Sequence, residues 1–203
     1  MTENPLFTRI PPDTVVLARD GDLVVRLMRD DIAEYELYAT WRNTPHVREW
    51  WDYDDPPMTT EAAAAECRPM VDGSDATIAC IIEVGDVPVG FVQLYPWSAY
   101  PEELVECDLR VPDGAWSLDI FIGSEAHIAR GVGSRTVRLV AEHAFTQRGA
   151  TAFAFGVSQG NLRAIRAYEK AGMRAERQYL DIDVKHGERL LSLWMVRYPD
   201  AQP

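Results

Sequence analysis

The chain has 203 residues, of which 47% are hydrophobic, and a formal net charge of −12 at pH 7. Its length and composition predict one domain over residues 1–203 with a full core. They exclude a membrane span, because no apolar run approaches the ~20 residues that a bilayer requires. The negative charge argues against nucleic acid or an anionic membrane as partner. It fits either an ordinary solvated surface or a cleft that concentrates a small polycationic ligand, on a monomer or a homodimer.

Cysteines and histidines limit the chemistry further. The three cysteines are odd in number and stand in apolar or helical surroundings, which predicts reduced core thiols in a cytoplasmic protein. The four histidines are scattered without the paired spacing of metal ligands, so we expect no metal site. These residues are Cys67, Cys80, Cys107, His46, His127, His143 and His186.

The chain begins with a predicted arm and a strand pair. Residues 1–14 are rich in proline and predict an irregular arm lying over the domain. Apolar runs at 15–18 and 23–27, separated by the turn Asp20-Gly21-Asp22, predict two paired strands. The N-terminus lacks the basic patch and apolar stretch of a signal peptide.

Two helices are expected next. One of the aspartates at 30–31 can cap the first helix, and Asn43-Thr44-Pro45 ends it. One of the threonines at 59–60 starts a second, alanine-rich helix that runs through Cys67. The predicted core face of the first helix is Ile32, Tyr35, Tyr38 and Ala39.

The segment between these helices, residues 46–57, interleaves aromatic rings with carboxylates and follows neither the helix nor the strand period. One of the two tryptophans, Trp50 or Trp51, is expected to fill the core. The other can offer a flat apolar floor to a sugar ring, while neighbouring carboxylates meet ammonium groups. Those carboxylates are Glu49, Asp52, Asp54 and Asp55.

The middle and end of the chain predict most of a sheet. Residues 77–95 form a central hairpin around the turn Gly85-Asp86. The loop at 96–114 is a second stretch rich in both aromatic and acidic residues, Trp97 and Tyr100 among them. Further strands are expected at 151–157, 173–180 and 189–197, with Gly187 in the last turn. The sum is an α/β (α+β) fold with a mixed, mostly antiparallel sheet and helices on both faces.

A strand, a glycine loop and a helix occur in succession at 117–145. Ser117–Ile122 alternate as in a half-buried strand, and Gly131 and Gly133 follow in the loop. Backbone N–H groups at a helix N-terminus can bind phosphate, and Arg130 and Arg135 would add positive charge. The helix is predicted from an apolar face with helical spacing, namely Val137, Val140, Ala141, Ala144 and Phe145.

A second helical segment runs from Asn161 to Met173. Asn161 is a good N-cap, and Gly172 is placed to end the helix. The predicted shared face is Leu162, Ile165 and Tyr168.

Together, these two segments resemble the GNAT superfamily of acyl-coenzyme A N-acyltransferases. The glycine loop matches at Gly131 and Gly133, with Ile128 where the family has Gln or Arg. The second helix matches at Asn161, Ala164, Tyr168, Lys170, Gly172 and Met173. Within the superfamily the chain is most similar to aminoglycoside 6′-N-acetyltransferases, through Glu49-Trp50-Trp51, Asp119, Gly131–Ser134 and the Asn161 helix, over roughly residues 23–197.

The resemblance implies direct attack of an amine on the thioester of acetyl-coenzyme A. It implies Asp119 as the general base and Tyr168 as the acid that protonates the departing thiolate. The structural alternatives are a salt-bridged Asp119 and a Tyr168 that only packs beside Ile165. Main-chain groups of the strand would hold the oxyanion and the pantetheine. The implied cofactor contacts are Ile120, Phe121, Ile122, Arg130, Gly131, Val132, Gly133, Ser134, Asn161 and Tyr168.

The implied substrate is a polycationic antibiotic whose acetylation confers resistance. Where the aminoglycoside enzymes carry an Asp shortly before the Asn161 helix, this chain has Gly156, so a kasugamycin-type amine is an alternative. A siderophore lysine, a protein N-terminus, and a non-catalytic binder of acyl-coenzyme A or antibiotic are the rival hypotheses. The implied substrate contacts are Glu49, Trp50, Trp51, Asp52, Trp97, Tyr100 and Asp119.

Overall fold

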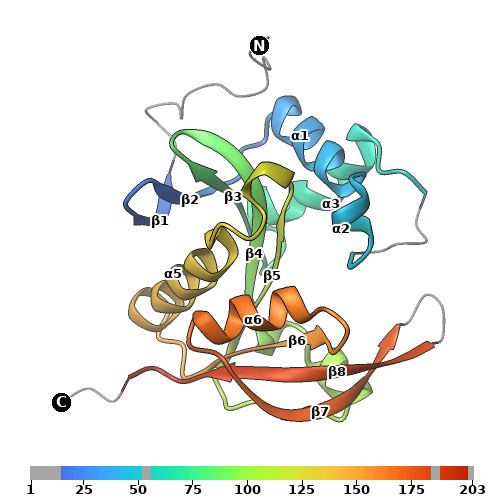
Figure 1. Cartoon of the computed structure of the whole chain (residues 1–203), viewed down its shortest axis with the longest axis vertical. Coiled ribbons are helices and arrows are strands. Elements are labelled where there is room, and N and C mark those ends of the chain that lie inside the picture. The colour runs from blue at the N-terminus through green and yellow to red at the C-terminus, as the bar shows by residue number, and fades with distance from the viewer. Residues whose placement is uncertain (1–14, 52–55, 184–187, 201–203) are drawn as a thin grey trace. The chain divides into compact units, whose positions relative to one another are not determined.

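The computed structural model describes residues 15–51, 56–183 and 188–200 (Figure 1). Residue contacts divide the chain into two compact units. The first unit is Met1–Gln93 with Ile120–Val132, and the second is Leu94–Asp119 with Gly133–Pro203. The single domain remains a prediction, and both the predicted arm and the Gly187 turn lie outside the described residues.

Eight strands are hydrogen-bonded in the order β1-β2-β3-β4-β5-β6-β8-β7. β5 pairs with β6 in parallel, whereas β1–β2, β2–β3, β6–β8 and β7–β8 are antiparallel. The predicted mixed, mostly antiparallel sheet is confirmed. The strands are β1 (Val16–Asp20), β2 (Leu23–Leu27), β3 (Ile78–Val84), β4 (Val87–Pro96), β5 (Trp116–Ile122), β6 (Phe153–Ser158), β7 (Arg174–Asp183) and β8 (Glu188–Arg197).

The helices are close to those predicted, with two additions. α2 lies at the start of the segment 46–57, where no helix was expected, because Pro45 opens a single short turn of helix. The sequence pattern missed α4, which lies in the predicted loop at 96–114, where Pro101 opens a single short helix with acidic residues in its first turn. No described helix is long and apolar enough to cross a bilayer. The helices are α1 (Ile32–Arg42), α2 (Pro45–Arg48), α3 (Thr60–Asp72), α4 (Pro101–Glu106), α5 (Val132–Gln147) and α6 (Leu162–Lys170), with 3-10 turns η1 (Trp97–Ala99) and η2 (Glu125–His127).

In the first unit, α1 packs its predicted tyrosines into the core. Asp31 caps the helix by accepting a hydrogen bond from the backbone N–H of Ala33, and Tyr35 and Tyr38 are fully buried. The prediction for Ile32 was wrong, because this first helical residue faces solvent and is 62% exposed. Thr59 caps α3 in the same way, through the N–H of Ala62.

A buried ion network ties β2 to β3 and α1. The Arg26 guanidinium lies 2.6 Å from Glu83 Oε1 and 2.8 Å from Glu34 Oε1, and all three side chains are almost completely buried. Arg29 also donates to Glu34, at 2.6 Å. Burial raises the pKa of Glu83, and the Arg26 charge opposes that shift.

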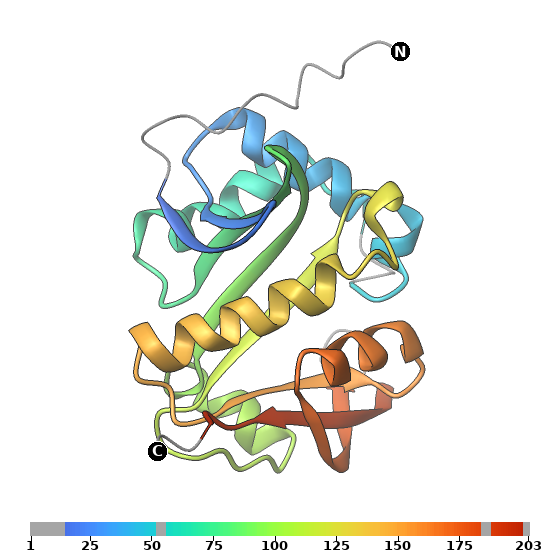
Figure 2. The ribbon, with the colours of Figure 1, turned by 60° about the vertical axis from the view of Figure 1, so that its left-hand side comes forward.

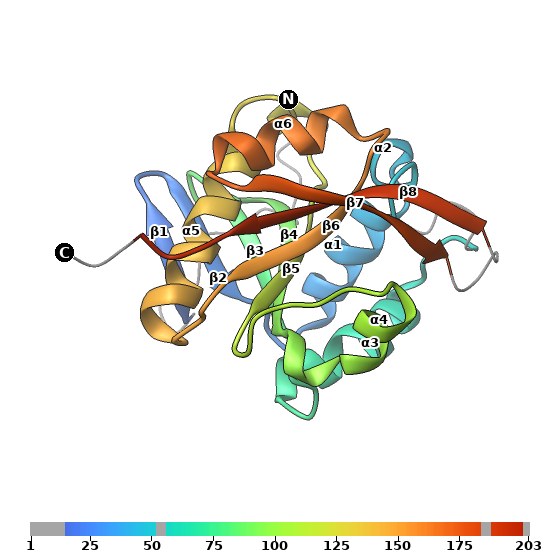
Figure 3. The ribbon, with the colours of Figure 1, turned by 90° about the horizontal axis from the view of Figure 1, so that it is seen from below.

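In the second unit, consecutive residues of β6 face opposite layers. Ala154 contributes to a core cluster with Trp97, Trp194 and the α4 side, whereas the next residue, Phe155, packs its ring against Tyr168 of α6 at 4.9 Å. Figure 3 shows α6 and α4 on opposite faces of β6, β8 and β7. The prediction of helices on both faces is therefore confirmed within this unit.

α5 shows the predicted apolar stripe. Val137, Val140, Ala141 and Ala144 are completely buried. With 16 residues it is the longest described helix, and it follows directly on the glycine loop (Figure 2). The predicted amphipathic helix is confirmed.

We expect Arg26→Met to lower the free energy of unfolding by about 3–5 kcal/mol, because it leaves the Glu83 carboxylate buried without its cation. Urea denaturation measures this loss. The double variant Arg26→Met/Glu83→Leu removes this ion pair, leaves Glu34 paired with Arg29 and serves as the matched control. We expect it to recover most of the stability; equal losses in the two proteins would contradict this explanation.

Candidate active site

Asp119 and Tyr168, the predicted base and acid, act on each other electrostatically. Burial raises the pKa of the Tyr168 hydroxyl, and the negative charge of Asp119 raises it further. Asp119 projects from β5 and is half-buried. The Tyr168 ring packs on Phe155, so the predicted packing role and a chemical role are compatible.

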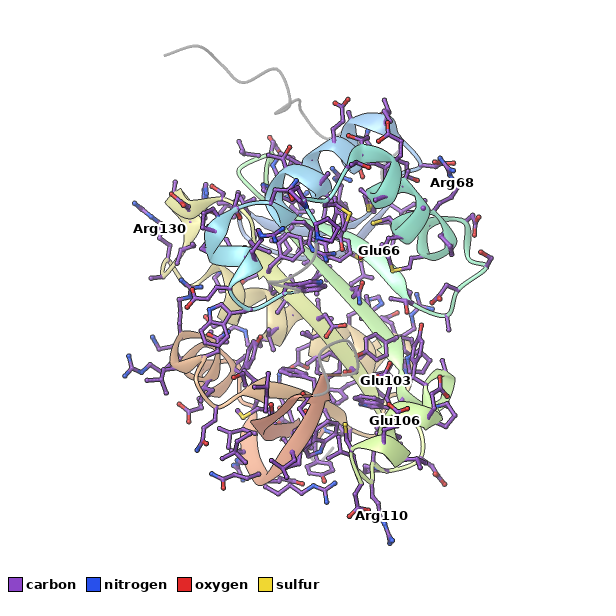
Figure 4. All side chains as sticks on the ribbon, turned by 90° about the vertical axis from the view of Figure 1, so that its right-hand side faces the viewer. Glu66, Arg68, Glu103, Glu106, Arg110 and Arg130 are labelled. Carbon is purple, nitrogen blue, oxygen red and sulfur yellow. The ribbon has the colours of Figure 1, made fainter. Side chains whose placement is uncertain are left out.

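The charge of Asp119 also raises the pKa of two further side chains of the second unit, Tyr95 and Glu103. Burial and then the Asp119 charge raise the pKa of Tyr95, a buried residue at the end of β4. Burial, Asp119 and the neighbouring carboxylates of Glu102, Glu106 and Asp181 raise the pKa of Glu103. Figure 4 shows Glu103 and Glu106 on α4. Glu103 therefore lies within electrostatic range of the predicted base, and three further carboxylates lie within range of Glu103.

The glycine loop leads directly into the N-terminus of α5. Gly131 has a φ of +81°, a left-handed conformation that favours glycine, and Ala129 shares that region at +59°. α5 begins at Val132, so its first N–H groups lack carbonyl partners within the helix. A Cβ at Gly133 would meet no described atom within 4 Å. Protein packing therefore does not require glycine there, and the open space suits a ligand.

Three polar or charged side chains near this loop were predicted to contact the cofactor. Arg130 is exposed and projects outward from the loop (Figure 4). Ser134 is half-buried in the first turn of α5. Asn161 caps α6, since its Oδ1 accepts from the N–H of Ala164 at 3.1 Å. Its side-chain N–H₂ group is what it can offer a cofactor.

The Glu49-Trp50-Trp51 segment follows α2, and one of its two tryptophans packs against the core. Trp51 lies edge-on to Phe121 at 5.2 Å and beneath the Arg42 guanidinium at 5.3 Å. Trp50 is 39% exposed, and Glu49 is exposed as well. The core-filling residue is thus Trp51, and Trp50 is the ring available as an apolar floor. Asp52, Asp54 and Asp55 lie outside the described residues.

The two aromatic residues expected from 96–114 differ in exposure. Trp97 is only 6% exposed, and its indole N–H donates to the carbonyl of Ala154 at 2.8 Å. Tyr100 is half-buried and packs edge-on to Tyr95 at 5.0 Å. Trp97 is therefore a core residue, and substrate contact by either ring stays a prediction.

The space beside Gly156 is occupied by a side chain from another strand. A Cβ on Gly156 would overlap the hydroxyl oxygen of Tyr179, which reaches across from β7. That hydroxyl donates to Asp181 Oδ2 at 3.1 Å, and Cys107 Sγ lies 3.7 Å from Asp181 Oδ1. Where a side chain on β6 would stand, the structure thus places a tyrosine bonded to a carboxylate of β7.

Sequence reasoning missed Tyr95, Tyr179 and Asp181. The strand pattern predicts only a strand residue at Tyr95, although its place at the end of a strand before an acidic loop is a signal. No local pattern indicates that Tyr179 meets Gly156. Among the residues the structure describes, no group of three or more histidine, cysteine or acidic side chains could hold a metal ion.

Comparison with known proteins identifies the family. A model described as an acetyltransferase (GNAT) domain matches residues 30–180. The chain belongs to the GNAT acetyltransferase family. The aminoglycoside N(6')-acetyltransferases type 1 of Klebsiella pneumoniae and Serratia marcescens are each 27% identical to this GNAT protein over 170 residues, 81% of this chain and 79% of theirs.

A solved structure has the same GNAT fold. The structure of AAC(6')-Ib in complex with ribostamycin and coenzyme A matches with a TM-score of 0.76 and 24% identity. It covers 89% of this chain and 95% of that one. The predicted GNAT fold is confirmed.

The two loop glycines should respond differently to alanine. Gly133→Ala should fold as well as the wild type, because its Cβ meets nothing within 4 Å, but it should bind coenzyme A more weakly. Gly131→Ala should lose about 1–2 kcal/mol of stability, because its φ of +81° strains any Cβ. Thermal unfolding and calorimetric titration with coenzyme A separate the two effects. Unchanged affinity in Gly133→Ala would remove this loop from the cofactor site.

Gly156 and Tyr179 should be coupled. Gly156→Ala should destabilise the protein, because the new Cβ overlaps the Tyr179 hydroxyl. Tyr179→Phe removes that hydroxyl, so the double variant should be more stable than the sum of the two single changes predicts. We expect a coupling of ~1–2 kcal/mol in a double-mutant cycle by urea denaturation. Simple additivity would show that the two residues do not meet.

Proposed function

We propose that this protein transfers an acetyl group from acetyl-coenzyme A to an amine of an aminoglycoside, preferentially the 6′-amino group, and so confers resistance. The observation that carries the proposal is the Asp119–Tyr168 pair, in which the Asp119 charge raises the pKa of a half-buried phenol that packs on Phe155. Family membership and the names of the 27% identical relatives support the same chemistry.

The described residues fit coenzyme A. The open space beside Gly133, the first N–H groups of α5 and the exposed Arg130 suit the pyrophosphate. Backbone groups of Ile120 and Ile122, which point to the edge of β5 away from β4, suit the amides of the pantetheine arm, whereas the Phe121 carbonyl points toward β4. When bound, acetyl-coenzyme A supplies the thioester that an amine attacks.

Asp119 serves as the general base in this proposal. The attacking amine is an ammonium ion at neutral pH and must first lose a proton, directly to the carboxylate or through water. The negative charges of Asp119 and Glu103, which act on each other, also attract that cation. The negative charge of Asp119 therefore helps to bind the ammonium group, and its carboxylate accepts the proton.

Tyr168 serves as the acid. Its pKa is raised, first by burial and then by Asp119, so the hydroxyl keeps its proton throughout the neutral range. A protonated hydroxyl in this position can donate to the departing sulfur. The edge contact with Phe155 holds the ring in place.

The substrate is proposed to be a small polycation, because the groups available to it are acidic and aromatic. Trp50 offers an exposed ring and Glu49 an exposed carboxylate in the first unit. In the second unit, Glu103 is a further exposed carboxylate, and Tyr100 is a half-buried ring. The three free cysteines fit a reducing, cytoplasmic location.

The function is tested by following thiol release from acetyl-coenzyme A with a panel of amines. The panel holds 6′-amino and 6′-hydroxy aminoglycosides, kasugamycin, lysine derivatives and a peptide. Turnover confined to the 6′-amino compounds supports the proposal. Turnover on kasugamycin alone would move the acetylated amine, and activity only on lysine derivatives or peptide would refute an antibiotic substrate.

Asp119→Asn should lower kcat by ~10²–10⁴, because the amide cannot accept the ammonium proton, while coenzyme A binds nearly as before. Tyr168→Phe should lower kcat by roughly tenfold or more and leave the packing on Phe155 intact. Steady-state kinetics and calorimetric titration provide both readouts. A wild-type kcat in either variant would reduce that residue to a structural role.

A further inference from the structure

His46 makes a contact that none of the roles above explains. Its Nε2 lies 2.9 Å from the carbonyl oxygen of Ile122, 76 residues away at the end of β5. A carbonyl oxygen only accepts, so Nε2 carries the proton in this hydrogen bond. The side chain is 14% exposed, and the bond is therefore largely shielded from competing water.

The carbonyl that His46 binds lies on one particular edge of β5. The Phe121 carbonyl points toward β4, because a Cβ on Gly90 of that strand would lie 2.5 Å from its oxygen. Backbone groups of successive strand residues point to opposite edges. The Ile122 carbonyl therefore points away from β4, to the edge where the amides of an extended ligand would pair with the strand.

The other end of this contact is equally well fixed. His46 lies in α2, where the next residue, Val47, is 3% exposed and part of the core cluster around Phe121. The backbone N–H of Trp50 donates to the Val47 carbonyl at 3.0 Å. The histidine thus connects the cofactor strand to the turn that presents the Glu49-Trp50-Trp51 segment.

Only one of the two ring nitrogens of His46 forms a hydrogen bond with a described residue. His46 Nδ1 is buried, and none of the described residues forms a hydrogen bond with it. The nearest acid is Glu125, whose Oε1 lies 3.5 Å away on a largely exposed side chain. The contact with Ile122 is therefore the one hydrogen bond by which His46 can hold β5.

We propose that His46 is a positioning residue of the acetyltransferase site. By donating to the Ile122 carbonyl it fixes the end of the strand edge that receives the pantetheine, and so sets the affinity for coenzyme A. The inference rests on the proposed function only in assigning that edge to the cofactor. His46 itself takes part in no proton transfer.

Three substitutions test this role. Gln places its side-chain N–H₂ as many bonds from the backbone as His Nε2, whereas Asn reaches only the level of Nδ1, and Ala offers no donor. We expect His46→Ala and His46→Asn to raise the dissociation constant of coenzyme A and the KM for acetyl-coenzyme A roughly three- to tenfold, the loss of one shielded hydrogen bond. His46→Gln should stay within about twofold of the wild type.

The readouts are calorimetric titration with coenzyme A alone, steady-state kinetics and thermal unfolding of each variant. A merely structural role would lower the unfolding temperature without separating Gln from Asn. Equal affinity in all variants, a Gln variant as weak as Asn, or a change only in the KM for the amine would overturn the inference. A wild-type protein that binds no coenzyme A would refute the proposed function itself. If His46→Ala does not fold, the Gln and Asn pair still decides.

Discussion

The packing of one ring, Phe121, fixes the strand on which the proposed chemistry depends. The ring stacks on Phe91 at 5.5 Å and meets Tyr38, Trp41 and Trp51 at 5.2–6.2 Å. These five rings come from α1, β4, β5 and the segment after α2, and the large apolar area that each ring buries fixes the rotation of the strand about its axis. Once Phe121 points into this core, alternation turns the side chains of Ile120 and Ile122 to the other face and sends their backbone groups to the edge away from β4.

Much of this could be predicted from sequence, because the responsible signals are local. Asn161 and Gly172 mark the ends of α6 by capping and by a left-handed residue, and the structure has both. The helical spacing of apolar residues predicted the face of α5 that is buried in the structure. The same reasoning failed for Leu162, which is 59% exposed, and for Ile32, since periodicity does not reveal that the first turn of a helix projects beyond its supporting layer.

The site was less predictable, because its contacts join distant positions. Nothing near Gly156 in the sequence indicates that Tyr179, 23 residues later, occupies the space beside it. Nothing near His46 indicates a bond to the backbone of Ile122. Motif resemblance supplied Asp119 and Tyr168, whose electrostatic coupling the structure then shows. It could not supply Tyr95 of β4 and Glu103 of α4, whose pKa values the Asp119 charge raises.

The carboxylates of the two units have different electrostatic neighbours. In the first, Glu83 and Glu34 are neutralised by Arg26, and Glu66 by Arg42 at 3.0 Å, so these acids stabilise the fold. In the second, Glu103 feels the charges of Asp119, Glu102, Glu106 and Asp181, which together with burial raise its pKa. Mutual repulsion of this kind lowers stability, and a bound cation relieves it. A polycationic substrate would therefore stabilise the very carboxylates that the fold leaves repelling one another, and this difference, more than the net charge of −12, favours an ammonium-bearing ligand.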